Sequence, residues 1–105
     1  MRAKLTRTAR RDLDEIRNYT LARWGRTQWV RYFAGLSGAF ARIAEDPRVG
    51  RERDLLCKGL RSLTFEHHII FFNPIRHADG AVIVVRIVHE RRDLAAMSFT
   101  EGMAP

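Results

Sequence analysis

The sequence has few of the features that mark secreted or membrane-embedded proteins. Its 105 residues include a single cysteine, Cys57, which excludes an intrachain disulfide and favours a reducing compartment. The longest apolar run is AVIVV, whereas a membrane-spanning helix needs about 18–20 apolar residues. A signal peptide is not expected either, because Asp12, Asp14 and Glu15 occupy the place of its apolar core. We therefore expect a cytoplasmic protein that is not embedded in a membrane.

Acidic residues are scarce relative to basic ones. The 12 Asp and Glu stand against 19 Lys and Arg, so the formal net charge is +7 and the sequence pI is near 11.0. This charge attracts polyanionic partners, either nucleic acid or an acidic protein segment. A composition of 46% hydrophobic and 30% charged residues is typical of an ordered chain, and its length predicts one domain over residues 1–105.

The N-terminal half carries two amphipathic helical patterns behind a short candidate strand at residues 2–5. The first pattern begins after Thr6, a favourable N-cap, and ends at Gly25, since glycine readily adopts the left-handed conformation that closes many helices. The second pattern follows at once and ends before Pro47. Because almost no chain separates the two patterns, they are predicted to fold back on each other as an antiparallel hairpin.

Gly35 and Gly38 interrupt the second helical pattern. A glycine costs about 1 kcal/mol relative to alanine in a helix interior, so its presence there calls for a reason. Glycine allows a neighbouring element to approach closely, and we expect the other helix to lie against these positions.

After a polar segment at residues 47–59, which is predicted to be a loop, the apolar spacing changes to that of strands. GLRSLTFEHHIIFFNP contains two strand candidates and AVIVVRIVH a third, with turn signals at Asn73-Pro74 and Asp79-Gly80. IIFF and VIVV are apolar on both faces, which is typical of central strands covered on both sides. The predicted fold class is therefore α+β, with a short N-terminal strand and an antiparallel helical hairpin packed on a small antiparallel β-sheet.

Five short motifs follow one another along the chain. They are DL..I..Y....WG from Asp12, P..GR from Pro47, GLRS from Gly59, H.IFF from His68 and RIVH.R.D from Arg86. Together they resemble the ParE toxins of the RelE/ParE superfamily, the toxin half of bacterial type II toxin–antitoxin systems. The resemblance covers roughly residues 3–94 and implies a core of that extent, followed by a short C-terminal tail.

The resemblance also implies a function. ParE toxins poison DNA gyrase, and a ParD-like antitoxin neutralises them with a disordered, often acidic C-terminal segment. A basic chain suits such a partner, because opposite charges promote association. The residues expected to contact antitoxin or target are Trp24, Tyr32, Arg61, Arg86, His89, Arg91 and Arg92. This interpretation needs no catalytic residue and no cofactor.

A ribosome-dependent mRNA endonuclease of the RelE type is the main alternative. Enzymes of that type use arginine and lysine side chains of the sheet and often a C-terminal tyrosine for acid–base and phosphate contacts. Here both tyrosines, Tyr19 and Tyr32, fall in the helical hairpin, and there are only two lysines. Some relatives use a glutamate and a histidine instead. In that case the candidate catalytic residues are His89, Glu90 (or Glu66), Arg61 and Arg86.

Arg86 interrupts an apolar strand, where an unpaired charge is costly. One prediction is an intrachain ion pair with Glu66 or Asp93 across the sheet. The other is an exposed basic ridge on which a partner's carboxylates would bind bidentately. The two predictions are compatible.

The remaining candidates are metal binding and direct nucleic-acid binding. His67 and His68 are adjacent, so in a strand they would point to opposite faces and would not share a metal ion. Cys57 stands alone, and no metal site is expected. A nucleic-acid-binding module would rest on net charge alone, without a helix-turn-helix or zinc-finger pattern, so no sequence-specific binding is expected.

Overall fold

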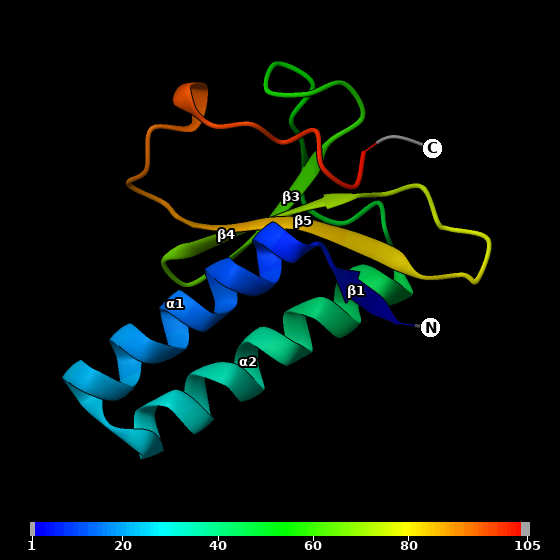
Figure 1. Ribbon diagram of the computed structural model, residues 1–105. Coiled ribbons are helices and arrows are strands. Elements are labelled where there is room, and N and C mark those ends of the chain that lie inside the picture. Colours follow the sequence, from blue (N-terminus) through cyan, green and yellow to red (C-terminus); the bar gives the residue numbers. More distant parts are fainter. Residues whose placement is uncertain (1, 104–105) are drawn as a thin grey trace.

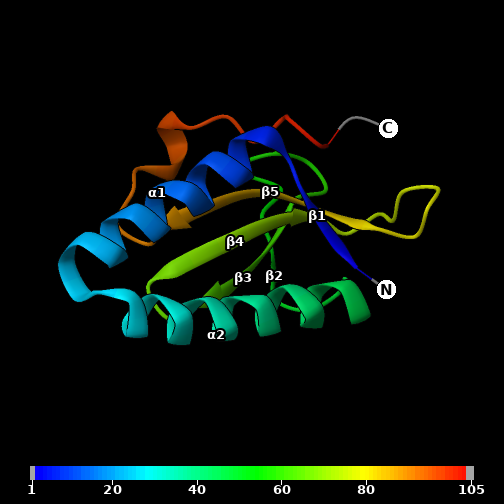
Figure 2. The same cartoon turned by 60° about the horizontal axis from the view of Figure 1, so that its bottom comes forward.

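Two helices cover one face of a five-stranded mixed sheet in the computed structural model, which describes residues 2–103 (Figures 1 and 2). The elements are β1 (Ala3–Leu5), α1 (Arg7–Trp24), α2 (Arg26–Glu45), β2 (Arg51–Glu52), β3 (Arg61–Phe65), β4 (His68–Asn73), β5 (Val82–His89) and the short 3-10 helix η1 (Leu94–Ala96). The strand order is β1-β5-β4-β3-β2. The predicted α+β class and helical hairpin are confirmed, and the predicted loop at residues 47–59 contains the two-residue strand β2.

The sheet is mixed rather than purely antiparallel. β1 runs parallel to β5, with Ala3 opposite Val82, whereas the other three pairings are antiparallel. The parallel pairing follows from how the chain enters α1. The Thr6 amide donates to the Val84 carbonyl at 3.0 Å, and its hydroxyl donates to the Val85 carbonyl at 2.9 Å. These bonds hold the start of α1 against the middle of β5.

Local sequence signals define the ends of both helices, as predicted. The Thr6 side chain caps α1 by accepting a hydrogen bond from the Ala9 amide at 3.0 Å. Gly25 ends α1 with a φ of 89°, a conformation that disfavours residues with a side chain. α2 ends at Glu45, directly before Asp46-Pro47. Within residues 2–103, neither helix is both long enough and apolar enough to cross a membrane.

The core lies on both faces of the sheet, as predicted for strands that are apolar on both sides. On the helical face the buried residues are Ala9, Leu36, Ile43, Ile70, Phe72, Val82, Val84 and Ile87. On the outer face they are Leu60, Ile69, Phe71, Val85, Val88 and Phe99. Figure 1 shows this outer face covered by the loop between β2 and β3 and by the C-terminal segment.

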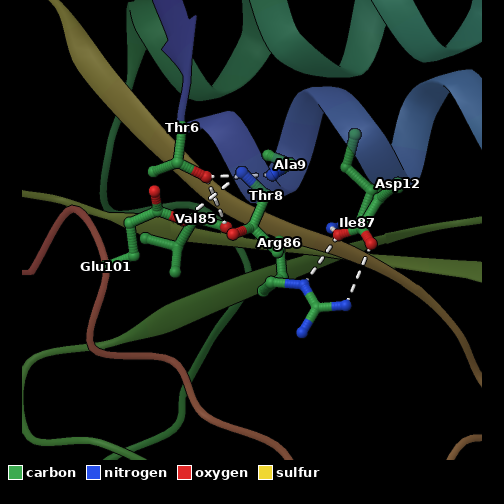
Figure 3. A network of polar contacts seen from close by, with 8 residues as sticks. All are labelled: Thr6, Thr8, Ala9, Asp12, Val85, Arg86, Ile87 and Glu101. Atoms are coloured by element: carbon green, nitrogen blue, oxygen red, sulfur yellow. Dashed lines mark hydrogen bonds and ion pairs between the residues drawn. The ribbon is translucent and has the colours of Figure 1, made fainter.

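The C-terminal segment contributes to the fold although no sequence pattern predicts it. Phe99 is buried against Phe71, with ring centroids 4.5 Å apart. The Glu101 carboxylate accepts a hydrogen bond from the Thr8 amide at 3.3 Å (Figure 3), and the Asn73 side-chain amide donates to the Gly102 carbonyl at 3.0 Å. The segment that follows β5 therefore belongs to the packed structure as far as Met103.

A β-bulge in β5 sets which side chains face the helices. Phe71 of β4 pairs with Arg86 and Phe72 pairs with Val84, so Val85 has no partner on β4. The extra residue shifts the alternation of side chains. As a result Ile87 belongs to the helical face, like Val84 three residues earlier, and His89 follows on the same face.

The two glycines of α2 differ from the prediction. A Cβ at Gly35 would lie 2.4 Å from the ring of Phe65, so the sheet approaches this position and not the other helix. A Cβ at Gly38 would have no neighbour within 4 Å. Close packing therefore explains Gly35 only.

This difference predicts opposite effects of two matched substitutions. Gly38→Ala should raise the free energy of unfolding by about 0.5–1 kcal/mol, because alanine favours a helix interior and fits in open space. Gly35→Ala should lower it by about 1–3 kcal/mol, because the packed Phe65 ring must move. Urea unfolding followed by circular dichroism measures both. If Gly35→Ala instead stabilised the protein, the Phe65 ring would not hinder a side chain at position 35.

Candidate partner-binding site

A cavity of about 570 Å³ lies where the helical hairpin meets the β3–β4 turn and the end of β5. The hairpin turn projects beyond this end of the sheet in both views of the fold (Figures 1 and 2). The helices contribute Glu15, Ile16, Tyr19, Thr20, Trp24, Gln28 and Tyr32, and the sheet contributes Glu66, His67, His68 and His89. Of the residues predicted to contact antitoxin or target, the structure brings three together here: Trp24, Tyr32 and His89. Glu66, the alternative candidate for a catalytic glutamate, also lines the cavity.

Tyr32, His68 and His89 lie next to one another in the wall of the cavity. The Tyr32 hydroxyl and His68 Nδ1 are hydrogen-bonded at 2.5 Å, and the His68 and His89 rings meet edge to face with centroids 5.4 Å apart. Burial, and then the charge of Glu66, raise the pKa of Tyr32, which keeps the hydroxyl protonated. Burial, and then the neighbouring His89 and His67, lower the pKa of His68 to about 4. At neutral pH the tyrosine therefore donates to an uncharged imidazole.

The lowered pKa makes stability depend on pH through His68. The unfolded imidazole titrates near 6.5 and the folded one at about 4, so the unfolded state binds the proton first as pH falls. The contribution of His68 is fully present above pH 6.5 and is lost toward pH 4. We expect His68→Asn to remove about 1–2 kcal/mol of this pH dependence, less than the full shift implies, because the ring is partly solvated.

Urea unfolding between about pH 4.5 and 7.5 tests this expectation. His77→Asn is the matched control, because His77 is exposed in the β4–β5 turn and outside the cavity. An equal pH dependence in wild type and His68→Asn would contradict the assignment.

Arg86 is paired within the chain, but not with the partners predicted from the sequence. Its guanidinium is directed at Asp12 of α1 (Figure 3), so the predicted pairing with Glu66 or Asp93 is wrong. Nε and Nη2 donate to the two carboxylate oxygens at 2.8 and 2.9 Å, and the Ile87 amide donates to the same carboxylate at 3.0 Å. The Asp12 hydrogen bond raises the pKa of Arg86. Both side chains are largely buried, at 16% and 10% exposure, so the pair joins α1 to β5.

Arg61 lies far from His89 along the sheet. Arg61 pairs with Phe72 and His89 pairs with His68, and these two β4 positions are four residue steps apart, about 13 Å along the strand. The Arg61 guanidinium donates to the carbonyls of Arg48 at 2.7 Å and Gly50 at 3.2 Å. The structure therefore does not gather the candidate ribonuclease residues at one point.

The basic turn after β5 adjoins the cavity. Arg91 and Arg92 are both exposed, and the Arg92 amide donates to the His89 carbonyl at 3.0 Å. Arg92 also lines a smaller hollow of about 120 Å³ that shares His68 and His89 with the large cavity. Glu90 lies 3.3 Å from Nδ1 of His67, with both side chains exposed. Arg91 and Arg92, two of the residues predicted to contact a partner, thus form a basic rim beside the cavity mouth.

Comparison with known proteins identifies the family. Residues 3–94 match the family described as ParE toxin of type II toxin-antitoxin system, parDE. The chain belongs to the ParE toxin family. It is 36% identical over 90 residues to Toxin ParE1 of Mycobacterium tuberculosis, and the match covers 86% of this chain and 90% of that protein. It is 30% identical over 93 residues to Toxin ParE1 of Caulobacter vibrioides, with coverage of 89% and 93%.

A solved structure shares the fold of this ParE family member. It is described as the chromosomal ParDE TA system from P. aeruginosa, and the match has a TM-score of 0.69 at 22% identity. It covers 85% of this chain and 95% of the other. The resemblance noted from the sequence motifs is confirmed.

Several cavity residues of this ParE toxin were missed by sequence reasoning. His67 lies in the β3–β4 turn and not in a strand, so the alternation argument fails and His67 and His68 line the same cavity. Tyr19 was predicted only to lie in the helical hairpin, yet it is 62% exposed at the cavity mouth. An aromatic residue off the apolar stripe of α1 is the signal that could have found it. Among residues 2–103, no group of histidine, cysteine and carboxylate side chains could hold a metal ion.

Proposed function

We propose that this toxin inhibits DNA gyrase by binding it, without catalytic chemistry of its own, and that a ParD-like antitoxin neutralises it in the cytoplasm. The observation that carries the proposal is the dispersal of the candidate catalytic cations. Arg61 is bound to backbone carbonyls about 13 Å along β4 from His89, and Arg86 is neutralised by Asp12. Phosphoryl cleavage needs such cations on the scissile phosphate.

The surface around the hairpin turn supports action by binding. Large apolar side chains are exposed on both helices: Tyr19, Leu21, Trp24, Val30 and Phe33. Tryptophan and tyrosine dominate the energetics of protein interfaces, and exposed apolar patches mark interaction sites. Arg91 and Arg92 add a basic rim that suits an acidic partner.

An mRNA endonuclease is the second candidate, because Tyr32, His68 and His89 are grouped in one cavity. An imidazole hydrogen-bonded to a phenol is a possible acid–base pair. A reporter mRNA translated by purified ribosomes tests it. Site-specific cuts that disappear with His89→Ala would establish this alternative and overturn the proposed one.

A labelling experiment in cells separates the two functions. The toxin is expressed from a controlled promoter in a bacterial host, and incorporation of thymidine and of amino acids is followed in parallel. A gyrase inhibitor should stop DNA synthesis first, and co-expression of the ParD-like antitoxin should restore it. Arrest of protein synthesis before DNA synthesis would contradict the proposal.

A further inference from the structure

The cavity at the hairpin end differs in charge from the rest of the protein. The chain carries 19 Lys and Arg and a net charge of +7. None of the lysines or arginines of residues 2–103 lines the large cavity, whereas Glu15 and Glu66 do. The cavity wall is thus a local negative region within a basic molecule, with Arg91 and Arg92 beside its mouth and not in the wall, and the charge of the wall suits a cationic ligand.

Aromatic rings complete the walls of this negative region. Tyr19 and Trp24 stand at the mouth with 62% and 63% of their surfaces exposed, and Tyr32 lies deeper. The face of an aromatic ring attracts a cation within about 6 Å of its centroid, and tryptophan does so most strongly. The guanidinium of Arg23, which lies outside the cavity wall, is already 5.4 Å from the Trp24 centroid.

Glu66 occupies a position where glutamate is conformationally unfavourable. It is the first residue of the two-residue turn between β3 and β4 and has a φ of 51°. Hairpin turns with positive φ at this position favour glycine or asparagine, and another residue costs about 1 kcal/mol. The carboxylate is therefore held in the cavity wall at some cost to stability.

These observations define the occupant by its chemistry. We propose that the cavity receives an arginine side chain from the antitoxin segment. This inference rests on the proposed function, in which an antitoxin binds the toxin. A guanidinium stacks on aromatic faces and donates to carboxylates in a planar fork, so it uses the rings and Glu15 and Glu66 together. The exposed rings of Tyr19 and Trp24 at the mouth leave the cavity accessible to a side chain presented by a docked segment. The antitoxin segment would then combine acidic residues for Arg91 and Arg92 with one arginine for the cavity.

The test uses the purified full-length toxin and small probes, without gyrase or antitoxin. N-acetyl-arginine amide is titrated at constant ionic strength, and the indole signals of Trp24 and Trp29 are followed by NMR. N-acetyl-citrulline amide is the matched neutral probe. The arginine compound should bind at least about tenfold more tightly than citrulline, equivalent to about 1.4 kcal/mol. Equal affinities, no detectable arginine binding, or tighter binding of adenosine monophosphate would overturn the inference.

Variants separate the cavity from the fold. Glu66→Gly should lower arginine affinity about tenfold while preserving or raising the melting temperature, because glycine relieves the positive φ. Glu52→Gln, on exposed β2, should change affinity less than about twofold. Undiminished arginine binding by Glu66→Gly would overturn the assignment. Gyrase inhibition without arginine binding would refute this inference alone and would not contradict the proposed function.

Discussion

Replacing Asp12 with alanine is expected to destabilise the domain by about 3–5 kcal/mol, the typical cost of removing one partner of a buried ion pair. The substitution would leave the buried Arg86 guanidinium without its carboxylate and the Ile87 amide without its acceptor. Small domains are stable by only about 5–15 kcal/mol in total, so a large share of stability would be lost. Denaturant unfolding measures the difference.

Asp14→Ala provides the matched control on the same helix, because Asp14 is exposed. It should change the free energy of unfolding by less than about 0.5 kcal/mol. Equal effects of the two substitutions would show that the Asp12–Arg86 pair does not hold α1 against β5.

The same ion pair bears on Arg86, which was also expected to contact a partner. Arg86→Ala should reduce toxicity mainly by unfolding the toxin, which circular dichroism distinguishes from a loss of binding.

Replacing Trp24 with alanine is expected to weaken antitoxin binding by about 2 kcal/mol or more, roughly 30-fold. Trp24 is 63% exposed and forms part of the cavity mouth, so it is free to become buried by a partner. Because it lies outside the core, the variant should keep the melting temperature of the wild type. Isothermal titration of the toxin with the purified ParD-like antitoxin measures the change.

Leu55 is the control for Trp24, because it is a fully exposed apolar residue on the loop between β2 and β3, away from the hairpin turn. Leu55→Ala should leave antitoxin affinity unchanged. Arg91→Ala should weaken binding by less than about 1 kcal/mol at low salt, because charges at an exposed rim contribute little. If Leu55→Ala weakened binding as much as Trp24→Ala, the hairpin end would not be the antitoxin site.

The parts of the fold that depend on neighbouring residues could be predicted from the sequence. Thr6, Gly25 and Pro47 act within one helical turn of their own positions, so they identify the helix ends directly. The runs IIFF and VIVV predict central strands because burial on both faces needs apolar residues throughout. These signals are enough to predict a helical hairpin on a sheet.

The site depends on contacts between distant residues and was only partly predictable. Asp12 and Arg86 are 74 positions apart, and helix periodicity does not show which carboxylate of α1 faces β5. The bulge at Val85 changes which face His89 occupies, and alternation along the strand gives no sign of it. His67 shares a cavity with His68 because a turn reverses the chain there. Trp24, Tyr32 and His89 were identified one by one, whereas their meeting follows from how the hairpin packs on the sheet.

DNA supercoiling by purified gyrase tests the central claim most directly. Relaxed plasmid, gyrase and ATP are incubated with increasing amounts of the toxin, and the topoisomers are separated by electrophoresis. Supercoiling should fall as the toxin approaches the gyrase concentration, and prior addition of the ParD-like antitoxin should restore it. Unchanged supercoiling at a large molar excess of folded toxin would contradict the account.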